Sequence, residues 1–141
     1  MSGINIEERL FRGVSILSLS GKLGLGESNR QLHDSIKHLV SEGKTQIVIN
    51  LAKVTHIDSS GLGELVSGYT TLKAANGELK LASVNDRVTS LMTITKLYTV
   101  FEIFGEELDA VYSFDEQVAA PVTGPLDSGW DPKVLAASSI Q

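Results

Sequence analysis

Hydrophobic residues fall into short segments along this chain, some with the period of a strand and others with that of a helix. Residues 46–51 form a nearly continuous apolar run, Gln-Ile-Val-Ile-Asn-Leu, which is typical of a parallel strand buried on both faces. Between residues 62 and 72 the apolar positions instead recur at helical spacing and form one stripe. That stripe consists of Leu62, Leu65, Val66, Tyr69 and Leu72. The pattern predicts a buried strand followed closely by an amphipathic helix.

The segments before this pair predict a hairpin and a first helix. Residues 4–6 alternate apolar and polar positions, and residues 14–19 indicate a second strand after a turn at Arg12-Gly13. Apolar residues at helical spacing then mark a helix that ends near Gly43, a residue type common at helix C-termini. These apolar residues are Leu32, Ile36, Leu39 and Val40. We expect the two strands to pair in an antiparallel hairpin.

The segments after the pair continue the alternation. Asn76-Gly77 predicts a turn, and residues 79–83 predict a short strand after it. Asn85 can then cap a further helix. A strand near residues 101–104 and a helix over about 108–114 complete the series. Alternating strands and helices favour an α/β fold, in which helices lie on a mixed, largely parallel sheet of about five strands with an N-terminal hairpin.

The composition changes near the C-terminus. Pro121, Pro125, Pro132 and Trp130 all lie in the last 21 residues, and that segment is also rich in Ala, Ser and Gly. It shows no sustained periodicity. We therefore expect one domain over residues 1–117 and a Pro/Gly/Ser-rich tail over residues 118–141, with Trp130 able to anchor on a groove.

The charge and the N-terminus exclude several classes of function. Seventeen acidic residues against twelve basic residues give a formal net charge of -5, and no Lys/Arg cluster offers a surface for nucleic acid or an anionic membrane. The N-terminus lacks a signal-peptide pattern, and no apolar run approaches a membrane span. The absence of cysteine excludes disulfide and thiol chemistry. We expect a soluble, cytoplasmic protein.

The most informative segment lies between the buried strand and the helix. Asp58, Ser59 and Ser60 stand at the helix start, where small polar side chains accept hydrogen bonds from unpaired backbone N–H groups. The same N–H groups and the helix dipole also tolerate a phosphate. Gly61 and Gly63 follow, although glycine within a helix costs about 1 kcal/mol relative to alanine. Either they leave the Ser60 hydroxyl accessible to a partner, or they allow the helix to pack closely on the sheet.

The segment Ile57-Asp58-Ser59-Ser60-Gly61-Leu62-Gly63 resembles the phosphorylation motif of bacterial anti-sigma factor antagonists, which are small STAS-domain proteins. The resemblance continues into residues 77–81 and 97–104 and covers about residues 4–117. It implies that Ser60, directly before the first glycine, is phosphorylated and that Asp58 helps to set the local hydrogen bonding. It also implies that the neighbouring motif residues, Ser59, Gly61, Leu62 and Gly63, contact a partner.

The resemblance implies a binding module rather than an enzyme, without a cofactor or a metal. Unmodified, the protein would bind an anti-sigma factor that is also an ATP-dependent serine kinase, and would thereby release a sigma factor. Phosphate on Ser60 adds a charge of about -1.5 to -2, which would weaken that contact. A separate phosphatase would restore the serine, and a homodimer is compatible with this scheme.

The glycine-rich segment Gly21–Ser28 leaves two alternatives open. Its spacing fits neither a Walker loop nor a dinucleotide fingerprint, yet a small-molecule or nucleotide binder that uses this loop is one alternative. Gly24 stands where many members of the family carry an aspartate near the partner surface. The second alternative is therefore a STAS regulatory domain of a different signalling assembly.

The three histidines and the two serines do not indicate a metal site or a hydrolase. His33 and His38 are five residues apart, which is about 140° around a helix, and we expect both on the surface. His56 precedes the motif and is either structural or in contact with Asp58 or a phosphate. Ser59 and Ser60 are not within a Gly-x-Ser-x-Gly elbow, so a serine hydrolase fits poorly.

Overall fold

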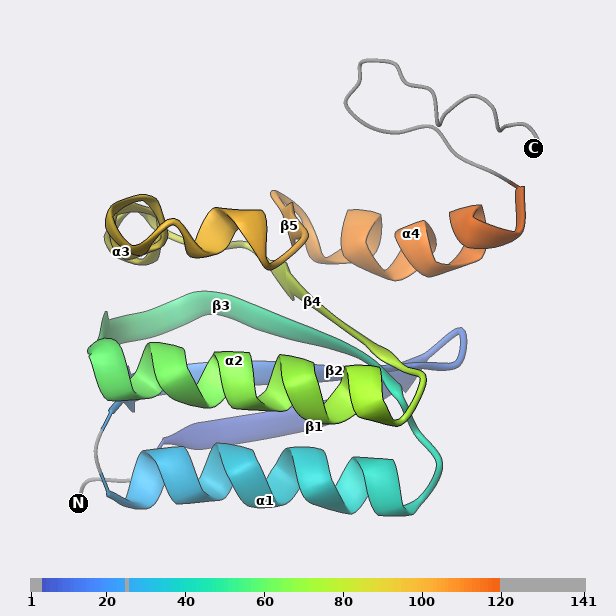
Figure 1. Ribbon diagram of the computed structural model, residues 1–141, viewed down its shortest axis with the longest axis horizontal. Helices are drawn as coiled ribbons and strands as arrows, with labels where there is room; N and C mark the ends of the chain where they lie inside the picture. Colours follow the sequence, from blue (N-terminus) through green and yellow to red (C-terminus); the bar gives the residue numbers. More distant parts are fainter. Residues whose placement is uncertain (1–3, 25, 120–141) are drawn as a thin grey trace. The chain divides into compact units, whose positions relative to one another are not determined.

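The computed structural model describes residues 4–24 and 26–119. The chain divides into two units, residues 1–110 and residues 111–141. The described elements are β1 (Asn5–Phe11), β2 (Val14–Leu23), α1 (Glu27–Ser41), β3 (Gln46–Ile57), α2 (Ser59–Ala74), β4 (Glu78–Ala82), α3 (Asp86–Thr95), a 3-10 turn (Leu97–Thr99), β5 (Ile103–Phe104) and α4 (Glu107–Ala119). Figure 1 shows these elements in chain order. All five strands belong to the first unit, and they form one sheet.

The sheet has the strand order β1-β2-β3-β4-β5. β1 is antiparallel to β2, and each later neighbour is parallel to the one before it. The hairpin turn is tight because Arg12 and Gly13 both have positive φ, 55° and 80°, as a two-residue turn between twisted strands requires. The α/β fold with a mixed five-stranded sheet and an N-terminal hairpin is thereby confirmed.

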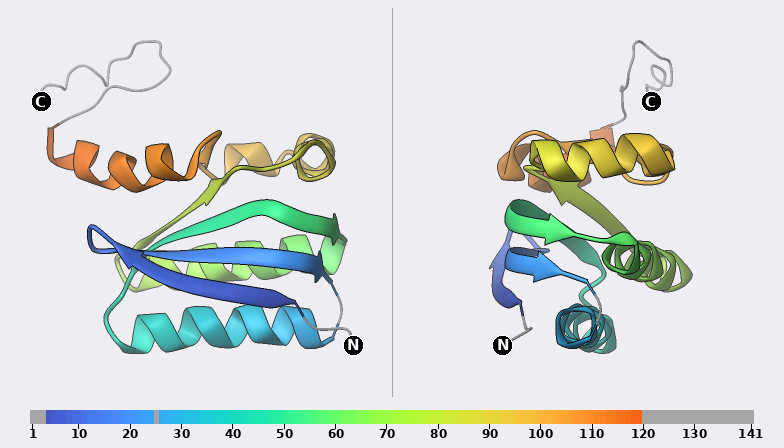
Figure 2. Two further views of the ribbon diagram at one scale, coloured as in Figure 1. Left: turned by 180° about the vertical axis from the view of Figure 1, so that it is seen from behind. Right: turned by 90° about the vertical axis from the view of Figure 1, so that its left-hand side faces the viewer.

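Alternate residues of the strands pack against the first two helices. Figure 2 shows α1 and α2 side by side against one face of the sheet. The buried core on this face combines strand residues Leu17, Leu19, Ile47, Ile49, Leu79 and Leu81 with helix residues Leu32, Ile36, Leu39, Leu62, Leu65 and Leu72. Val48, which alternates with Ile47 and Ile49 on β3, is also fully buried. The first half of β3 is therefore buried on both faces, as the continuous apolar run over residues 46–51 predicts.

Three element boundaries differ from those expected. β3 continues to Ile57 rather than ending near residue 51, because it pairs with β2 as far as Leu23. β5 is only two residues long, since Phe101 N–H bonds to the Leu97 carbonyl at 3.2 Å in the preceding turn. α4 begins one residue earlier and ends five residues later than residues 108–114.

Residues 120–141, which include Trp130 and most of the expected tail, lie outside the described residues, whereas residues 118 and 119 belong to α4. The division at residue 117 stays a prediction. Within the part of the chain that the structure describes, no helix combines the length and the apolar character needed to cross a membrane.

Candidate functional site

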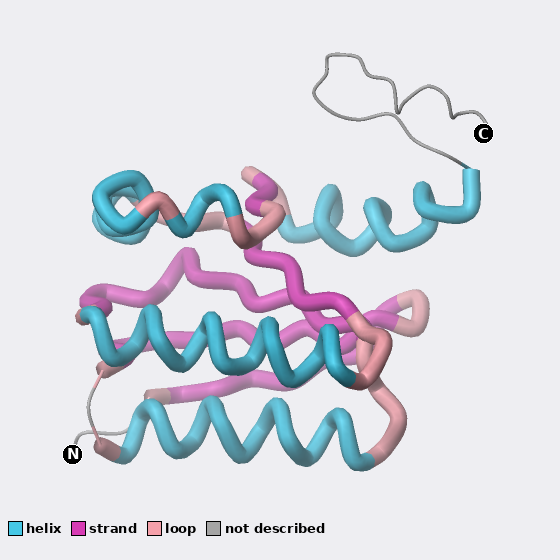
Figure 3. Tube along the Cα trace, in the orientation of Figure 1, coloured by secondary structure: helices cyan, strands magenta, loops and turns pink. Residues whose placement is uncertain are grey.

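The site begins where β3 passes into α2 with only Asp58 between them (Figure 3). Asp58 has extended backbone angles, φ -113° and ψ -177°, and its side chain caps α2. Its Oδ1 accepts a hydrogen bond from the Gly61 N–H at 2.9 Å, and its carbonyl accepts one from the Leu62 N–H at 3.0 Å. The capping role expected of this residue is therefore confirmed, and it fixes the direction in which the first turn of α2 leaves the sheet.

The Ser60 hydroxyl lies in a short chain of hydrogen bonds at this helix start. Its Oγ donates to Asp58 Oδ1 at 2.7 Å, while Asn29 Nδ2 on α1 donates to Ser60 Oγ at 3.2 Å. Ser60 is half-buried, whereas Ser59 is exposed. Of the two serines, Ser60 is thus the one whose hydroxyl is held by neighbouring side chains while the residue keeps some exposed surface.

The two glycines of the motif have different surroundings. A β-carbon on Gly61 would lie 2.5 Å from the carbonyl oxygen of Leu23 at the end of β2, so this glycine allows the helix start to approach the sheet. A β-carbon on Gly63 would meet nothing within 4 Å, and Gly63 is exposed. Close packing therefore explains Gly61, while the packing of the described residues gives no reason for a glycine at 63.

The connection from β2 to α1 lies directly beside Asp58. A β-carbon on Gly24 would lie 2.6 Å from Asp58 Oδ2, so the Asp58 carboxylate occupies the space that a side chain at this position would need. Gly24 N–H donates to Ser28 Oγ at 3.0 Å, and the same hydroxyl donates to the Gly24 carbonyl at 3.2 Å. The buried Ser28 thereby ties the start of α1 to the end of β2.

This geometry reduces the support for a phosphate-binding loop over Gly21–Ser28. Residues 21–23 continue strand β2 and pair with β3, and the Gly24 N–H is already bonded to Ser28. A phosphate loop instead needs several successive backbone N–H groups directed at its ligand. The structure places Gly24 beside Asp58, and nucleotide binding by this loop stays an untested alternative.

The remaining expected residues lie at or near the motif. Leu62 is buried in the core with 3% of its surface exposed, so its side chain contributes packing rather than exposed surface. His56 is exposed and pairs with Lys22 in the sheet register. Within the described residues, no group of three or more His, Cys, Asp or Glu is placed to hold a metal ion.

Two contacts between α1 and α2 were not expected. Asn29 contacts Ser60, and one turn further along both helices His33 Nδ1 lies 3.1 Å from Glu64 Oε2. His33 is exposed, as expected, but it is part of this pair. The apolar stripe of the first helix could have indicated that Asn29 faces inward. Asn29 precedes Leu32 and Ile36 by three and seven residues, so it lies on the helix face directed at the core.

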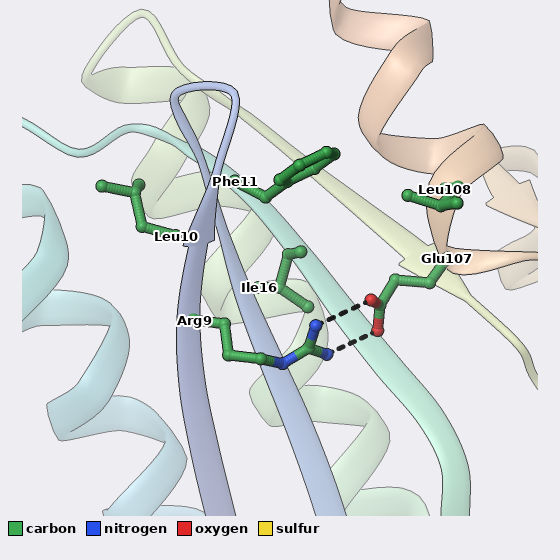
Figure 4. A pocket seen from close by; sticks show the side chains of 6 residues that line it. All are labelled: Arg9, Leu10, Phe11, Ile16, Glu107 and Leu108. Atoms are coloured by element: carbon green, nitrogen blue, oxygen red, sulfur yellow. Dashed lines mark hydrogen bonds and ion pairs between the residues drawn. The ribbon is translucent and has the colours of Figure 1, made fainter.

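Surface pockets also lie outside this motif. One, of about 550 Å³, is lined by Ile57, Asp86, Arg87, Ser90 and Leu91, and therefore includes the residue directly before Asp58. A second, of about 430 Å³, is lined by residues of the β1–β2 hairpin and the start of α4. Figure 4 shows the Arg9 guanidinium facing the Glu107 carboxylate in this second pocket. The hydrogen bond from Arg9 holds the pKa of Glu107 below its usual value.

The profile of the STAS domain matches residues 5–110 of this chain, and the chain therefore belongs to the STAS domain family. An anti-sigma F factor antagonist of Paenibacillus polymyxa is 31% identical over 111 residues, which cover 77% of this chain and 92% of that relative. The resemblance stated on the motif residues is thereby confirmed for the family.

Solved structures agree with the fold. An anti-sigma factor antagonist from Mycobacterium paratuberculosis matches with a TM-score of 0.70 and 23% identity, over 79% of this chain and 93% of that chain. The phosphorylated form of the Bacillus cell fate determinant SpoIIAA matches with a TM-score of 0.62 and 20% identity, over 79% of this chain and 99% of that chain. At these identities the likeness establishes the shared fold.

Proposed function

We propose that this chain is an anti-sigma factor antagonist, a protein-binding module switched by phosphorylation of Ser60. The observation that carries the proposal is the Ser60 hydroxyl itself, half-buried at the start of α2 and held between Asp58 and Asn29. The family and the name of the Paenibacillus relative support the same function.

The switch acts by charge at a surface that need not change its fold. Phosphate on Ser60 would add about -1.5 to -2 charge at a helix N-terminus, a place that tolerates anions. It would also replace the hydrogen bond from Ser60 to Asp58 with repulsion between two anions, because these oxygens are 2.7 Å apart. A partner surface that fits the bare hydroxyl would then meet a bulky dianion and lose affinity.

The partner of the unmodified protein is an anti-sigma factor that phosphorylates Ser60 with ATP, and a phosphatase reverses the modification. In this scheme the chain is a substrate and a ligand rather than an enzyme, and it acts in the bacterial cytoplasm. Asp58, Ser59, Ser60 and Gly63 form the exposed or half-exposed part of the contact surface, and the buried Gly61 lies beneath it.

Three variants test this function against candidate anti-sigma kinases from the same cell. Ser60→Ala is expected to bind the kinase like the wild type and to resist phosphorylation, whereas Ser60→Asp is expected to bind at least about tenfold more weakly. Ser59→Ala is the matched control, since it removes the neighbouring exposed hydroxyl and should still be phosphorylated. Equal binding by Ser60→Asp and Ser60→Ala, measured by calorimetry, would reject the switch.

Gly24 favours one second candidate, a STAS regulatory domain of a different signalling assembly. Because residue 24 is glycine, the surface beside the motif lacks a side chain that many family members present there, and the Asp58 carboxylate lies in that space instead. A partner selected for that surface need not regulate a sigma factor. Affinity capture with the full chain from its native cell separates the candidates, since recovery of a partner other than an anti-sigma factor supports this second one.

A further inference from the structure

We propose that Asn29 is a positioning residue for the phosphorylation of Ser60, an inference that rests on the proposed function. Asn29 lies on α1, thirty-one residues before Ser60 in the sequence, and its Nδ2 donates to Ser60 Oγ at 3.2 Å. It acts through the serine by holding the hydroxyl oxygen in the orientation needed for attack.

The hydrogen bonds around Ser60 Oγ define that orientation. A serine hydroxyl has one proton to donate and two lone pairs that can accept. The proton is directed at Asp58 Oδ1 at 2.7 Å, and one lone pair accepts from Asn29 Nδ2. Among the described contacts, the second lone pair is left for a reacting atom. Two partners on two different elements therefore hold Oγ in one rotamer.

The other atom of the Asn29 amide supplies an independent observation. Asn29 Oδ1 is buried and has no hydrogen-bond partner among the described residues. A buried acceptor without a partner destabilises the fold, whereas an apolar side chain of similar shape would avoid that cost. Stability alone would therefore not select asparagine here, and the contact from Nδ2 to Ser60 gives the reason for its presence.

The reaction that Asn29 assists is phosphoryl transfer from a nucleoside triphosphate bound to the kinase. Ser60 Oγ forms a bond to the γ-phosphorus while the bond from that phosphorus to the departing nucleoside diphosphate breaks. The hydroxyl proton passes to the Asp58 carboxylate, which already accepts its hydrogen bond. Asn29 fixes the position of Oγ before the step, and a fixed nucleophile reacts faster because less orientational freedom is lost.

The test compares substitutions on the same face of α1. Asn29→Leu keeps a similar volume and removes the donor, and its kcat for phosphorylation is expected to fall about 10-fold to 100-fold, with KM unchanged and stability unchanged or higher. Asn29→Asp keeps the shape of the side chain and also lacks the N–H donor, so its kcat should fall by a similar factor. His33→Leu is the matched control, because it removes the contact between α1 and Glu64 one turn away and should leave kcat unchanged.

A second measurement needs no kinase. Proton scalar couplings of Ser60 report its χ1 rotamer, and we expect one rotamer in the wild type and in His33→Leu but averaging in Asn29→Leu. Averaged couplings in the wild type, or an unchanged kcat in Asn29→Leu, would overturn the role of Asn29 while the proposed function stands. A wild-type chain that its kinase does not phosphorylate at Ser60 would overturn both.

Discussion

Gly61 and Gly63 both stand in the first turns of α2, yet a methyl group would meet different surroundings at each. At Gly63 a β-carbon has open space, so Gly63→Ala is expected to raise the free energy of unfolding by about 0.5–1 kcal/mol, the gain in helix propensity. At Gly61 it would lie 2.5 Å from the Leu23 carbonyl oxygen, so Gly61→Ala is expected to lower that free energy by about 1–3 kcal/mol. Urea denaturation of the two variants measures both changes.

The Gly63→Ala variant also distinguishes an effect on stability from an effect on partner binding. If Gly63 is kept to leave room for a partner, Gly63→Ala combines a more stable fold with weaker binding to the anti-sigma kinase, a common compromise at functional surfaces. Binding equal to that of the wild type would show that the partner does not use this position.

The residues of the site differ in whether their contacts lie within a few residues of sequence or between separate helices. Ser60 is singled out only by the resemblance of its segment to the family motif. Asp58 could be predicted as the cap of α2 because capping involves groups within three residues of each other. Asn29 and the pair of His33 with Glu64 could not, because their contacts depend on how α1 docks beside α2 across thirty-one residues of sequence. The sequence identifies Gly24 as a departure from the family pattern, but only the structure shows the Asp58 carboxylate in the space beside it.

At the scale of one element, α2 depends on a single capping side chain that also contacts Ser60. Asp58→Ala removes the acceptor for the Gly61 N–H, and we expect a loss of about 1 kcal/mol in the free energy of unfolding. Asp58→Asn is the matched control, since asparagine caps helices about as well as aspartate. Thermal and urea unfolding of both variants measure the effect, and equal losses would show that the carboxylate charge, rather than the cap, stabilises α2.

The ends of the strands were the least predictable elements. The extra residues of β3 lose the simple alternation of a strand, because only Val54 and Ile57 are buried over residues 52–57. The pairing of β2 with β3 shifts register twice along its length, between Ser18 and Ser20 and between Gly21 and Lys22, and such irregularities change which face a side chain occupies. Hydrophobic period therefore identified the buried half of β3 and missed the half that leads to Asp58.

At the scale of the whole sheet, one ion pair connects elements that are distant in sequence. The Arg9 guanidinium on β1 donates to both carboxylate oxygens of Glu107 at the start of α4, at 2.8 and 3.0 Å, and also to Ser18 on β2 at 3.0 Å. Asn50 on β3 donates to Glu107 Oε1 at 2.8 Å. Figure 4 shows the two bonds between Arg9 and Glu107. Neither hydrophobic period nor a motif predicts this network, because it is formed by polar positions on four separate elements.

The network makes stability depend on pH in a defined direction. The pKa of Glu107 lies below its ordinary value of 4.5, first because of the hydrogen bond from Arg9 and also because of the one from Asn50, while burial opposes the shift. A depressed carboxylate pKa stabilises the fold fully above the pKa of the unfolded chain, and this stabilisation is lost as the pH falls through the folded value. Since the Arg9 side chain is 44% exposed, we expect a contribution of at most about 1 kcal/mol.

Glu107→Gln tests this dependence because it keeps the shape and removes the ionisable group. Urea unfolding between pH 7 and pH 3 compares the free energy of unfolding of the wild type with that of Glu107→Gln. We expect the wild type to be more stable by a constant amount near neutral pH, and this difference should shrink as the pH falls below about 4.5. Glu106→Gln, a change at the exposed neighbouring position, serves as the control for altered net charge. A difference between the wild type and Glu107→Gln that stays the same down to pH 3 would mean that the Glu107 charge does not stabilise the start of α4 on the sheet.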